Sequence, residues 1–399
     1  MENNFPDSWK MLPLEDCIDA IIDYRGKTPR KAPFGIPLIT AKIVKGGRIL
    51  EPNEFIPVED YDDRMQRGIP KAGDIVVTTE APLGEVGQLD SRKLSVGQRL
   101  ITLRGKHGLL DNTYLKFLMM SEFVQTQLKA RETGTTVVGI KQKELRKVTL
   151  IVPPLSVQRS IADVLGALDD KIELNRRMNV TLEEMTTAVF KAWFSENEGA
   201  IAWKVVPLPE MIDVNPTRSL KKGAIVPYLD MANMPTQGHR AVEWINRPFG
   251  SGTKFINGDT LLARITPCLE NGKTAFVDFL EDEQVGWGST EYIILRPKPP
   301  LPVEYGYFLA RSEELRNHTI QNMTGTSGRQ RAPAACFDKY MLAVPPEALA
   351  KRFGEFAKDV MTKIRSNDQQ SRTLAALRDT LLPRLMSGEV KVKDWEKEL

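Results

Sequence analysis

The chain has 399 residues, of which 41% are hydrophobic and 27% are charged. This composition is ordinary for folded globular protein, and the length exceeds that of one typical domain, so two or more domains are expected. The 55 Lys and Arg residues barely exceed the 52 Asp and Glu residues, and the resulting net charge of +3 excludes a strongly basic chain. Any case for a nucleic-acid partner must therefore come from local charge and from the organisation of the chain.

Targeting, membrane and redox signals are absent from the sequence. The opening segment, Met1 to Pro6, lacks the basic and apolar regions of a signal peptide, and no apolar run is long enough to span a bilayer. The cysteines Cys17, Cys268 and Cys336 have neither metal-ligand nor disulfide spacing. We therefore expect a cytoplasmic protein with reduced thiols, no membrane association and no bound metal.

The first half of the chain begins with a region punctuated by Pro and Gly, which favours short strands. Strands are predicted at 36–40, 74–79 and 100–103. A helix of about three turns is predicted near 112–129, followed by a Thr-Gly-Thr loop at 133–135. A strand at 148–152 then ends at a double proline, after which one long helix is expected.

The second half repeats this plan, with strands at 260–263 and 292–295 and a helix near 303–321. Six short motifs return in the same order, separated by roughly 185–194 residues, which is the size of a domain with a connector. The pairs are Trp9-Lys10 and Trp203-Lys204, Ile18-Asp19 and Ile212-Asp213, Gly73-Asp74 and Gly258-Asp259, Ser121-Glu122 and Ser312-Glu313, Thr133-Gly134-Thr135 and Thr324-Gly325-Thr326, and Val152-Pro153-Pro154 and Val344-Pro345-Pro346. The sequence thus indicates an internal duplication.

Each double proline precedes a seven-residue pattern whose spacings alternate between four and three, as in the seam of a coiled coil. The first seam is Ile161, Leu165, Leu168, Ile172, Asn175, Asn179, Leu182, Thr186, Val189 and Trp193. The second seam is Phe353, Ala357, Val360, Ile364, Asn367, Ser371, Leu374, Arg378, Leu381 and Leu385. Each helix is expected to run for roughly 35–40 residues, or about 55–60 Å at 1.5 Å per residue.

Two such helices would bury their seams on each other. The duplication suggests a pseudo-two-fold axis, and a two-fold axis perpendicular to the helices makes them antiparallel. Asn175 and Asn367 are equivalent in the repeat and lie near the middle of their seams. We expect their side chains to face each other and to fix the helix register, since a buried polar pair is satisfied in only one alignment. The alternative is that both side chains point to solvent.

Together these features predict an α+β fold. It comprises two similar domains related by a pseudo-two-fold axis and joined by two long antiparallel coiled-coil helices.

The sequence offers no catalytic residues. The Gly-Lys-Thr triplets at 26–28 and 272–274 lack the first glycine of a phosphate-binding loop. Asn215-Pro216-Thr217 begins like the Asn-Pro-Pro-aromatic loop of adenine methyltransferases but lacks its later residues. No Ser, His, Asp or Cys residues have the context of a nucleophilic site. A recognition module is favoured over an enzyme.

Basic and hydroxyl side chains recur at equivalent loops in the two halves, which favours contact with a nucleic-acid backbone and with base edges. An early loop is basic in each half, and residues in and just after each Thr-Gly-Thr loop combine small hydroxyls with Lys, Arg and Gln. The candidates for DNA contact are Arg25, Lys27, Arg30, Lys31, Lys42, Thr133, Thr135, Lys141, Gln142, Lys143, Arg218, Lys221, Lys222, Lys273, Thr324, Thr326, Arg329, Gln330 and Arg331.

Nearly the whole chain resembles the specificity subunits of type I restriction–modification systems. In the first half the resemblance is carried by Asp23-Tyr24-Arg25-Gly26-Lys27-Thr28-Pro29, Gly35-Ile36-Pro37, Pro153-Pro154-Leu155, Gln158, Ile161, Leu165, Leu168-Asp169 and Lys171-Ile172. In the second half it is carried by Lys254-Phe255-Ile256-Asn257-Gly258-Asp259, Ile265-Thr266-Pro267-Cys268-Leu269-Glu270-Asn271-Gly272-Lys273 and Gly288-Ser289-Thr290-Glu291. The Pro-Pro-Leu, Gln and Leu-Asp-x-Lys-Ile combination is the specific part of this signal.

The resemblance implies a division into target-recognition domains at 1–152 and 197–345, a spacer helix at 153–196, and a second spacer helix with a tail at 346–399. Each recognition domain would read one half of a split, asymmetric site in double-stranded DNA. The helices would set the spacing between the halves and bind two methyltransferase subunits, and restriction/motor subunits would complete the complex. S-adenosylmethionine, ATP and Mg would act in those partners, so no cofactor is expected in this chain.

The second long helix departs from the family pattern, because it has Val360-Met361-Thr362-Lys363-Ile364 in place of Leu-Asp-x-Lys-Ile. The resemblance therefore implies that the two docking surfaces differ in strength. One alternative is a stand-alone DNA-binding or scaffold protein with the same two-domain frame, which co-purification would distinguish. A second alternative is a DNA methyltransferase, which a cofactor-binding assay on the isolated chain would distinguish.

Overall fold

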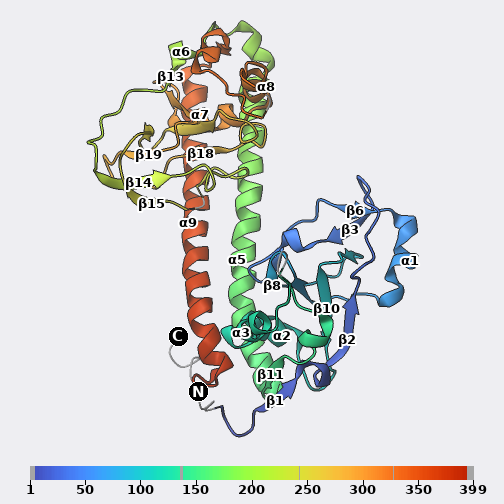
Figure 1. The fold of residues 1–399 in the computed structure, drawn as a ribbon. Coiled ribbons are helices and arrows are strands. Elements are labelled where there is room, and N and C mark those ends of the chain that lie inside the picture. The colour runs from blue at the N-terminus through green and yellow to red at the C-terminus, as the bar shows by residue number, and fades with distance from the viewer. Residues whose placement is uncertain (1–4, 135–137, 242, 327, 393–399) are drawn as a thin grey trace. The chain divides into compact units, whose positions relative to one another are not determined.

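The structure, a computed structural model, combines helices with several small sheets (Figure 1). It describes residues 5–134, 138–241, 243–326 and 328–392. The chain divides into two compact units: the first unit consists of residues 1–172 and 372–399, and the second unit of residues 173–371. Each unit contains a globular body and a stretch of each of two long helices.

The main sheet of the first unit has four antiparallel strands in the order β2-β10-β7-β8. All five residues of β7 are buried, because both faces of the sheet are covered. Ile75 and Val77 pack into a core shared with the helices, whereas Val76 between them packs into a core shared with the small sheet β6-β3-β9. The consecutive apolar residues Ile75, Val76 and Val77 are therefore the signature of a central strand buried on two sides.

The strands of the first unit are β1 (Lys10–Pro13), β2 (Ile18–Asp23), β3 (Ile36–Ile39), β4 (Val44–Lys45), β5 (Arg48–Ile49), β6 (Phe55–Ile56), β7 (Ile75–Thr79), β8 (Leu83–Gln88), β9 (Ser95–Val96), β10 (Leu100–Gly105) and β11 (Thr149–Val152). Its helices before the first long helix are α1 (Tyr61–Arg64), α2 (Asn112–Met120), α3 (Glu122–Ala130) and α4 (Gln142–Leu145). Short 3-10 turns lie at Leu14–Asp16, Ala41–Ile43, Val58–Asp60 and Met65–Arg67.

The second unit repeats this topology, with a main sheet in the order β13-β20-β17-β18 and a smaller sheet β15-β14-β19-β16. Its strands are β12 (Val205–Pro207), β13 (Ile212–Val214), β14 (Ile225–Leu229), β15 (Ile245–Pro248), β16 (Thr253–Phe255), β17 (Thr260–Ala263), β18 (Thr274–Phe276), β19 (Gly286–Gly288), β20 (Tyr292–Pro297) and β21 (Met341–Ala343). Its short helices are α6 (Leu208–Met211), α7 (Val303–Arg311) and α8 (Glu313–Gln321), with 3-10 turns at Glu198–Ala202 and Ala334–Lys339. The predicted α+β class with two alike domains is confirmed.

The pairing register makes the two units equivalent residue by residue. Leu103 lies opposite Ile75 in the first unit, as Leu295 lies opposite Thr260 in the second. The smaller sheets also correspond, since β3 and β9 form a parallel pair, as do β14 and β19. Equivalences between the units are therefore assigned below by counting along these paired strands.

The repeated Gly-Asp motif forms the turn that leads into the third strand of each main sheet, β7 or β17. Gly73 and Gly258 have φ values of 84° and 85°, a backbone conformation that glycine adopts without strain. The following aspartate closes the turn, since Asp74 accepts from the backbone N–H of Lys71, and Asp259 accepts from that of Ile256. The recurrence of this motif in the sequence thus reflects a requirement of the fold.

The helix predicted near 112–129 is two helices, α2 and α3, and the helix predicted near 303–321 is likewise α7 and α8. Each break falls on the serine of a repeated Ser-Glu motif, Ser121 or Ser312, which has extended backbone angles. The Ser312 hydroxyl accepts from the backbone N–H of Leu315, so this serine caps the second helix of its pair. The capping preference of serine overrides the helical periodicity that continues across it.

The two long helices are α5 (Leu155–Phe190) and α9 (Glu347–Met386), and α5 ends in a π-helical turn at Lys191–Ser195. Their contacts show that they run antiparallel in each unit. In the first unit Asp169 meets Arg378 at 2.7 Å. In the second unit Asn179 meets Asp368 at 2.8 Å, and further along α5 the ring of Phe190 packs on that of Phe353. None of the predicted seam positions is exposed, which supports the coiled-coil pattern.

Asn175 and Asn367 are both buried, with 1% and 3% of their surfaces exposed, so the alternative in which they point to solvent is wrong. Their contact differs from the predicted face-to-face amide pair. The Asn175 amide donates to the backbone carbonyl of Asn367 at 3.3 Å and to Gln370 Oε1 at 2.9 Å, and Asn367 donates to Asn179 Oδ1 at 2.8 Å. The offset arises because the antiparallel seam places each amide opposite the next turn of the other helix.

A buried ion cluster fastens the globular body of the first unit to both long helices. Lys116, from the middle of α2, donates to Asp169 Oδ2, and Arg378 of α9 donates to Asp169 Oδ1 at 2.7 Å. The side chains of Asp169 and Lys116 are 8% and 9% exposed. Asp169 belongs to the Leu-Asp-x-Lys-Ile motif, so the carboxylate of this motif is engaged inside the chain.

Replacement of Asp169 by Asn should destabilise the first unit by about 3–5 kcal/mol, because it removes the counter-charge of two largely buried cations. Urea denaturation followed by circular dichroism should show an unfolding transition at a lower midpoint. Asp170→Asn is the matched control, since Asp170 is exposed on the same helix, and it should change the free energy of unfolding by less than about 0.5 kcal/mol. Equal effects of the two substitutions would contradict the role given to the cluster.

Candidate nucleic-acid interface

Each Thr-Gly-Thr loop forms a hairpin that is hydrogen-bonded to the end of a main-sheet strand. In the first unit the backbones of Thr133 and Gly139 exchange hydrogen bonds of 2.7 and 3.0 Å, and Ile140 N–H donates to the Thr79 carbonyl. In the second unit Thr324 and Arg331 exchange bonds of 3.0 and 2.9 Å. Each hairpin is thus held by backbone hydrogen bonds at its base. Thr135 of the first unit lies outside the described residues.

The second-unit hairpin presents a mixture of exposed and tied side chains. Thr324, Thr326 and Arg329 are exposed. The Arg331 guanidinium instead donates to both oxygens of Glu291, at 2.8 and 3.0 Å, and this pair braces the base of the hairpin. The backbone carbonyl of Gln330 accepts from Thr266 N–H at 3.0 Å. Of the residues predicted here, Arg329 and the threonines are placed to meet a ligand, and Arg331 also has a structural role.

The corresponding segment of the first unit leads into α4. Lys141 is the residue that precedes this helix, and Gln142 and Lys143 are in its first turn. Lys141 and Lys143 are exposed, and Gln142 is half-buried. The structure therefore leaves the two lysines of this predicted group accessible.

The early basic loop of the first unit is largely neutralised within the chain. Arg30 forms salt bridges with Glu59 at 2.8 Å and Asp60 at 2.9 Å. Lys31 and Lys42 share Glu54, at 2.8 and 3.5 Å, and the hydrogen bond from Lys31 lowers the pKa of that carboxyl below its ordinary value.

The other two predicted cations of this loop also lie near carboxylates. Arg25 lies 3.7 Å from Asp23, and Lys27 lies 4.0 Å from Asp63. The strongly positive loop that the sequence suggests is therefore matched by acidic residues that the fold brings alongside it. A phosphate that approaches these cations would compete with their acidic partners.

The predicted cations of the second unit have different surroundings. Lys221 and Lys222 are exposed. Lys273 donates to the backbone carbonyls of Met231 and Ala232, so its ammonium group holds a loop of the chain rather than facing solvent freely. Arg218 donates to Asp259 at 2.9 Å and lines a pocket.

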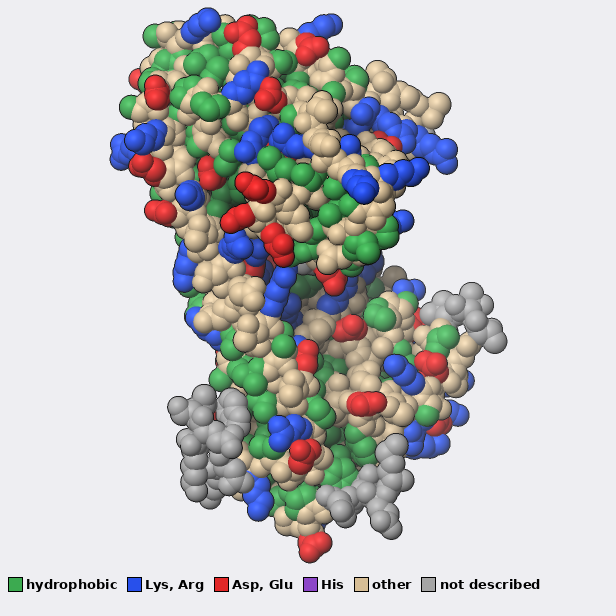
Figure 2. Space-filling view, turned by 90° about the vertical axis from the view of Figure 1, so that its left-hand side faces the viewer, with side chains coloured by type: hydrophobic (Ala, Val, Ile, Leu, Met, Phe, Trp, Pro, Cys, Tyr) green, Lys and Arg blue, Asp and Glu red, His purple; other side chains and the backbone are tan. Residues whose placement is uncertain are grey.

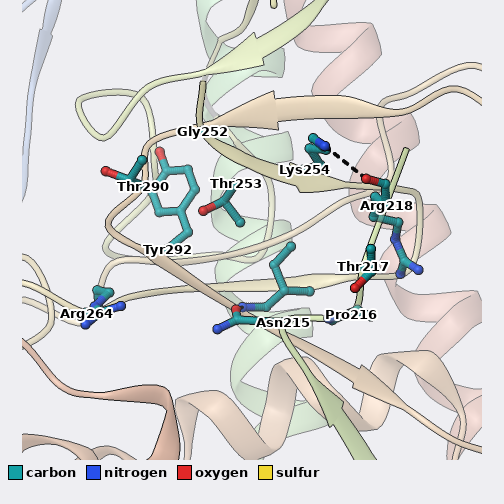
Figure 3. Close-up of a pocket in the computed structure, with 11 residues that line it drawn as sticks. Asn215, Pro216, Thr217, Arg218, Gly252, Thr253, Lys254, Arg264, Thr290 and Tyr292 are labelled. Carbon is teal, nitrogen blue, oxygen red and sulfur yellow. Dashed lines mark hydrogen bonds between the residues drawn. The ribbon is translucent and has the colours of Figure 1, made fainter. Parts of the chain in front are cut away.

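This pocket is a concavity of about 320 Å³ between the end of β13, strand β16 and strand β20 (Figure 3). It is lined by Asn215, Pro216, Thr217, Arg218, Gly252, Thr253, Lys254, Arg264, Thr290, Tyr292 and Ile294. The lining contains three cations and no carboxylate, together with three threonine hydroxyls. Such a lining suits an anion that accepts several hydrogen bonds.

Sequence reasoning found only Arg218 of these cations. Lys254 and Arg264 were missed because they lie 36 and 46 residues after Arg218 in the sequence, and neither lies in a basic cluster. Lys254 did fall in a segment that carries the family resemblance, which was the one signal available.

Positive charge on the second unit is local rather than general. Figure 2 shows Lys and Arg side chains gathered towards the right-hand side of the upper globular body, among hydrophobic and a few acidic side chains. The described residues hold no group of His, Cys, Asp and Glu that could bind a metal ion, and none of their helices is long and apolar enough to cross a membrane.

The duplicated α+β bodies, their braced hairpins and the antiparallel helix pair define a class of DNA-recognition subunit. Residues 6–184 match the family described as "Type I restriction modification DNA specificity domain". The chain therefore contains a specificity domain of this family and is similar along its length to specificity subunits of type I restriction enzymes, which agrees with the resemblance seen in the sequence. These are the recognition components, not the catalytic components, of type I systems.

Individual relatives extend this match over the whole chain. The MjaIX specificity subunit of Methanocaldococcus jannaschii is 24% identical over 419 residues, which cover 98% of this chain and 95% of that protein. The EcoEI specificity subunit of Escherichia coli is 28% identical over 192 residues, which cover 46% of this chain and 32% of that protein. The crystal structure of the type I S subunit from M. genitalium has the same fold, with a TM-score of 0.59 and 15% identity over 96% of this chain and 97% of that one.

Arg329→Gln should weaken binding to a mixed-sequence DNA duplex, because Arg329 is exposed on a braced hairpin. The slope of log K against log salt concentration is negative, and loss of one phosphate contact should make it less steep by about 0.9. Fluorescence anisotropy over a salt series measures both quantities. Arg365→Gln is the matched control, since Arg365 is exposed on α9 of the same unit and should leave the slope unchanged. An unaltered slope in R329Q would remove Arg329 from the interface.

Proposed function

We propose that this chain reads an asymmetric DNA site in two parts, one with each globular body, and directs partner subunits that methylate adenine and cleave unmodified DNA. The observation that carries the proposal is one topology built twice with different side chains in equivalent loops. Two like-built bodies with unlike loops are suited to two different half-sites.

The division of labour follows from the family. Relatives that align with this chain are named as specificity subunits of type I restriction enzymes. Two methyltransferase subunits and the restriction/motor subunits would act in the cytoplasm with this chain, which would remain off the membrane. S-adenosylmethionine, ATP and Mg would be bound by those partners, and this chain would supply sequence recognition.

The proposed functional division differs from the compact units. Residues 1–152 and 197–345 would form the target-recognition domains, 153–196 the first spacer helix, and 346–399 the second spacer helix with its tail. Each compact unit contains a recognition domain plus stretches of both helices. The division into compact units supports the proposal, because each recognition domain then packs with a pair of helices rather than with a single helix.

The proposed DNA contacts are ranked by what each cation already does in the free chain. The least side-chain rearrangement on DNA binding is required of the exposed cations Arg329, Lys221, Lys222, Lys141 and Lys143. Arg30 and Lys31 are held by acidic neighbours and would contribute less. Contacts through Thr135 stay a prediction.

The two long helices would act as a spacer between the half-sites. Matched insertion of seven residues in both helices, beside Asn175 and beside Asn367, should lengthen the preferred gap and leave both half-sites unchanged, because one heptad preserves the seam. Mapping of adenine methylation in cells that contain the partner subunits measures both features. Insertion in α5 alone is the control, and it should abolish methylation because the seams no longer match. A change in the half-sites themselves would refute the spacer role.

We further propose that Asn175 and Asn367 fix the register of this spacer. Replacement of both by Leu should keep or raise the thermal midpoint, because buried polar groups are exchanged for apolar ones. The same variant should methylate sites with more than one spacing, because the alignment is no longer unique. Thr186→Val is the control, since this buried hydroxyl donates only within its own helix, to the Leu182 carbonyl at 2.8 Å. A single unchanged spacing in the double variant would contradict the register role.

A further inference from the structure

The pocket of the second unit contains hydrogen-bond donors that the chain leaves unused. Arg218 Nε and Arg264 Nε are both buried and have no hydrogen-bond partner within the described chain. Buried guanidinium donors without an acceptor are costly, and the oxygens of a bound anion would satisfy them. In the view of Figure 3, Arg264 lies on one side of the pocket and Lys254 and Arg218 on the other, with Thr253 between them.

The carboxylate nearest to this group does not cancel its charge. Asp259 pairs with Arg218 at 2.9 Å and also with Arg296 at 3.3 Å, so one buried carboxylate serves two arginines. Lys254 Nζ donates to the backbone carbonyl of Arg218, which is uncharged. Glu291 approaches Arg264 only to 4.0 Å and is held at close range by Arg331. An excess of positive charge therefore remains beside the cavity.

We propose that this pocket is a phosphate-binding subsite of the second unit, lined by Arg218, Lys254 and Arg264 and by the hydroxyls of Thr217, Thr253 and Thr290. Its ligand is a backbone phosphate of the DNA half-site that the second unit reads, and the inference rests on the proposed DNA-reading function.

Two substitutions test the pocket in different ways. Lys254→Gln removes one charge, whereas Thr217→Tyr places a larger side chain in the pocket lining and keeps every charge. Each should weaken binding of the full-length chain to its target duplex about tenfold. Each should also make the negative slope of log K against log salt concentration less steep, by about 0.9 per lost phosphate contact. Circular dichroism verifies folding, and K254Q keeps the test valid if T217Y does not fold.

Lys351→Gln is the control, because Lys351 is exposed on α9 of the same unit and away from the pocket lining. It should match the wild type in affinity and slope. If the wild type binds its target no more tightly than a random duplex, the DNA-reading function itself fails. If the wild type discriminates but K254Q and a folded T217Y bind as it does, only the phosphate subsite is refuted.

The source of the phosphate is tested separately. Inorganic phosphate and deoxyadenosine monophosphate are titrated calorimetrically into the DNA-free chain, and a duplex with single methylphosphonate substitutions is titrated in parallel. We expect one neutralised position in the second half-site to cost as much affinity as K254Q and to cost nothing further in that variant. Tight mononucleotide binding that T217Y abolishes without affecting DNA affinity would overturn the assignment in favour of a free nucleotide.

Discussion

Each globular body of this subunit is held to the long helices by a carboxylate on α5 that is largely covered by a helix of the body. In the first unit Lys116 of α2 reaches Asp169, which also binds Arg378. In the second unit the equivalent residue of α7, Tyr307, donates to Glu183, and the buried His239 ring lies 3.3 Å from the same carboxylate. The position of each body on the long helices depends on these pairings, since the burial of a carboxylate without partners would cost a large amount of free energy.

This difference explains the departure from the family motif in the second helix. Met361 stands where the duplication would place a counterpart of Asp169, and it is buried in an apolar core. The second unit takes its carboxylate from α5 instead of α9, so an aspartate at 361 would have no cation to meet. Because Asp169 is itself buried, its replacement by Met361 does not remove an exposed docking group, and unequal docking surfaces do not follow from it.

The sequence carries the large-scale plan, because duplication and heptad spacing are patterns of residue type along one chain. It predicted the order of elements, the two long helices and the burial of Asn175 and Asn367. It failed where the outcome depends on residues brought together by folding. Arg30 and Lys31 are neutralised by acidic residues that lie 23 to 30 positions later in the sequence. The pocket cations Lys254 and Arg264 come from strand β16 and from the residue that follows strand β17. The break at Ser121 was visible as a repeated Ser-Glu motif but was outweighed by helical periodicity.

The near-neutral charge of the chain fits the way its cations are used. A subunit that reads a sequence must bind its site much more tightly than the excess of other DNA, and every freely exposed cation raises affinity for all DNA alike. In the first unit the early basic loop is neutralised by Glu54, Glu59 and Asp60, which lowers this general attraction. In the second unit cations such as Arg218 are recessed, where a phosphate must be correctly placed to meet them. Positive charge confined in this way contributes to binding only when the DNA is in register, and so it favours recognition over general attraction.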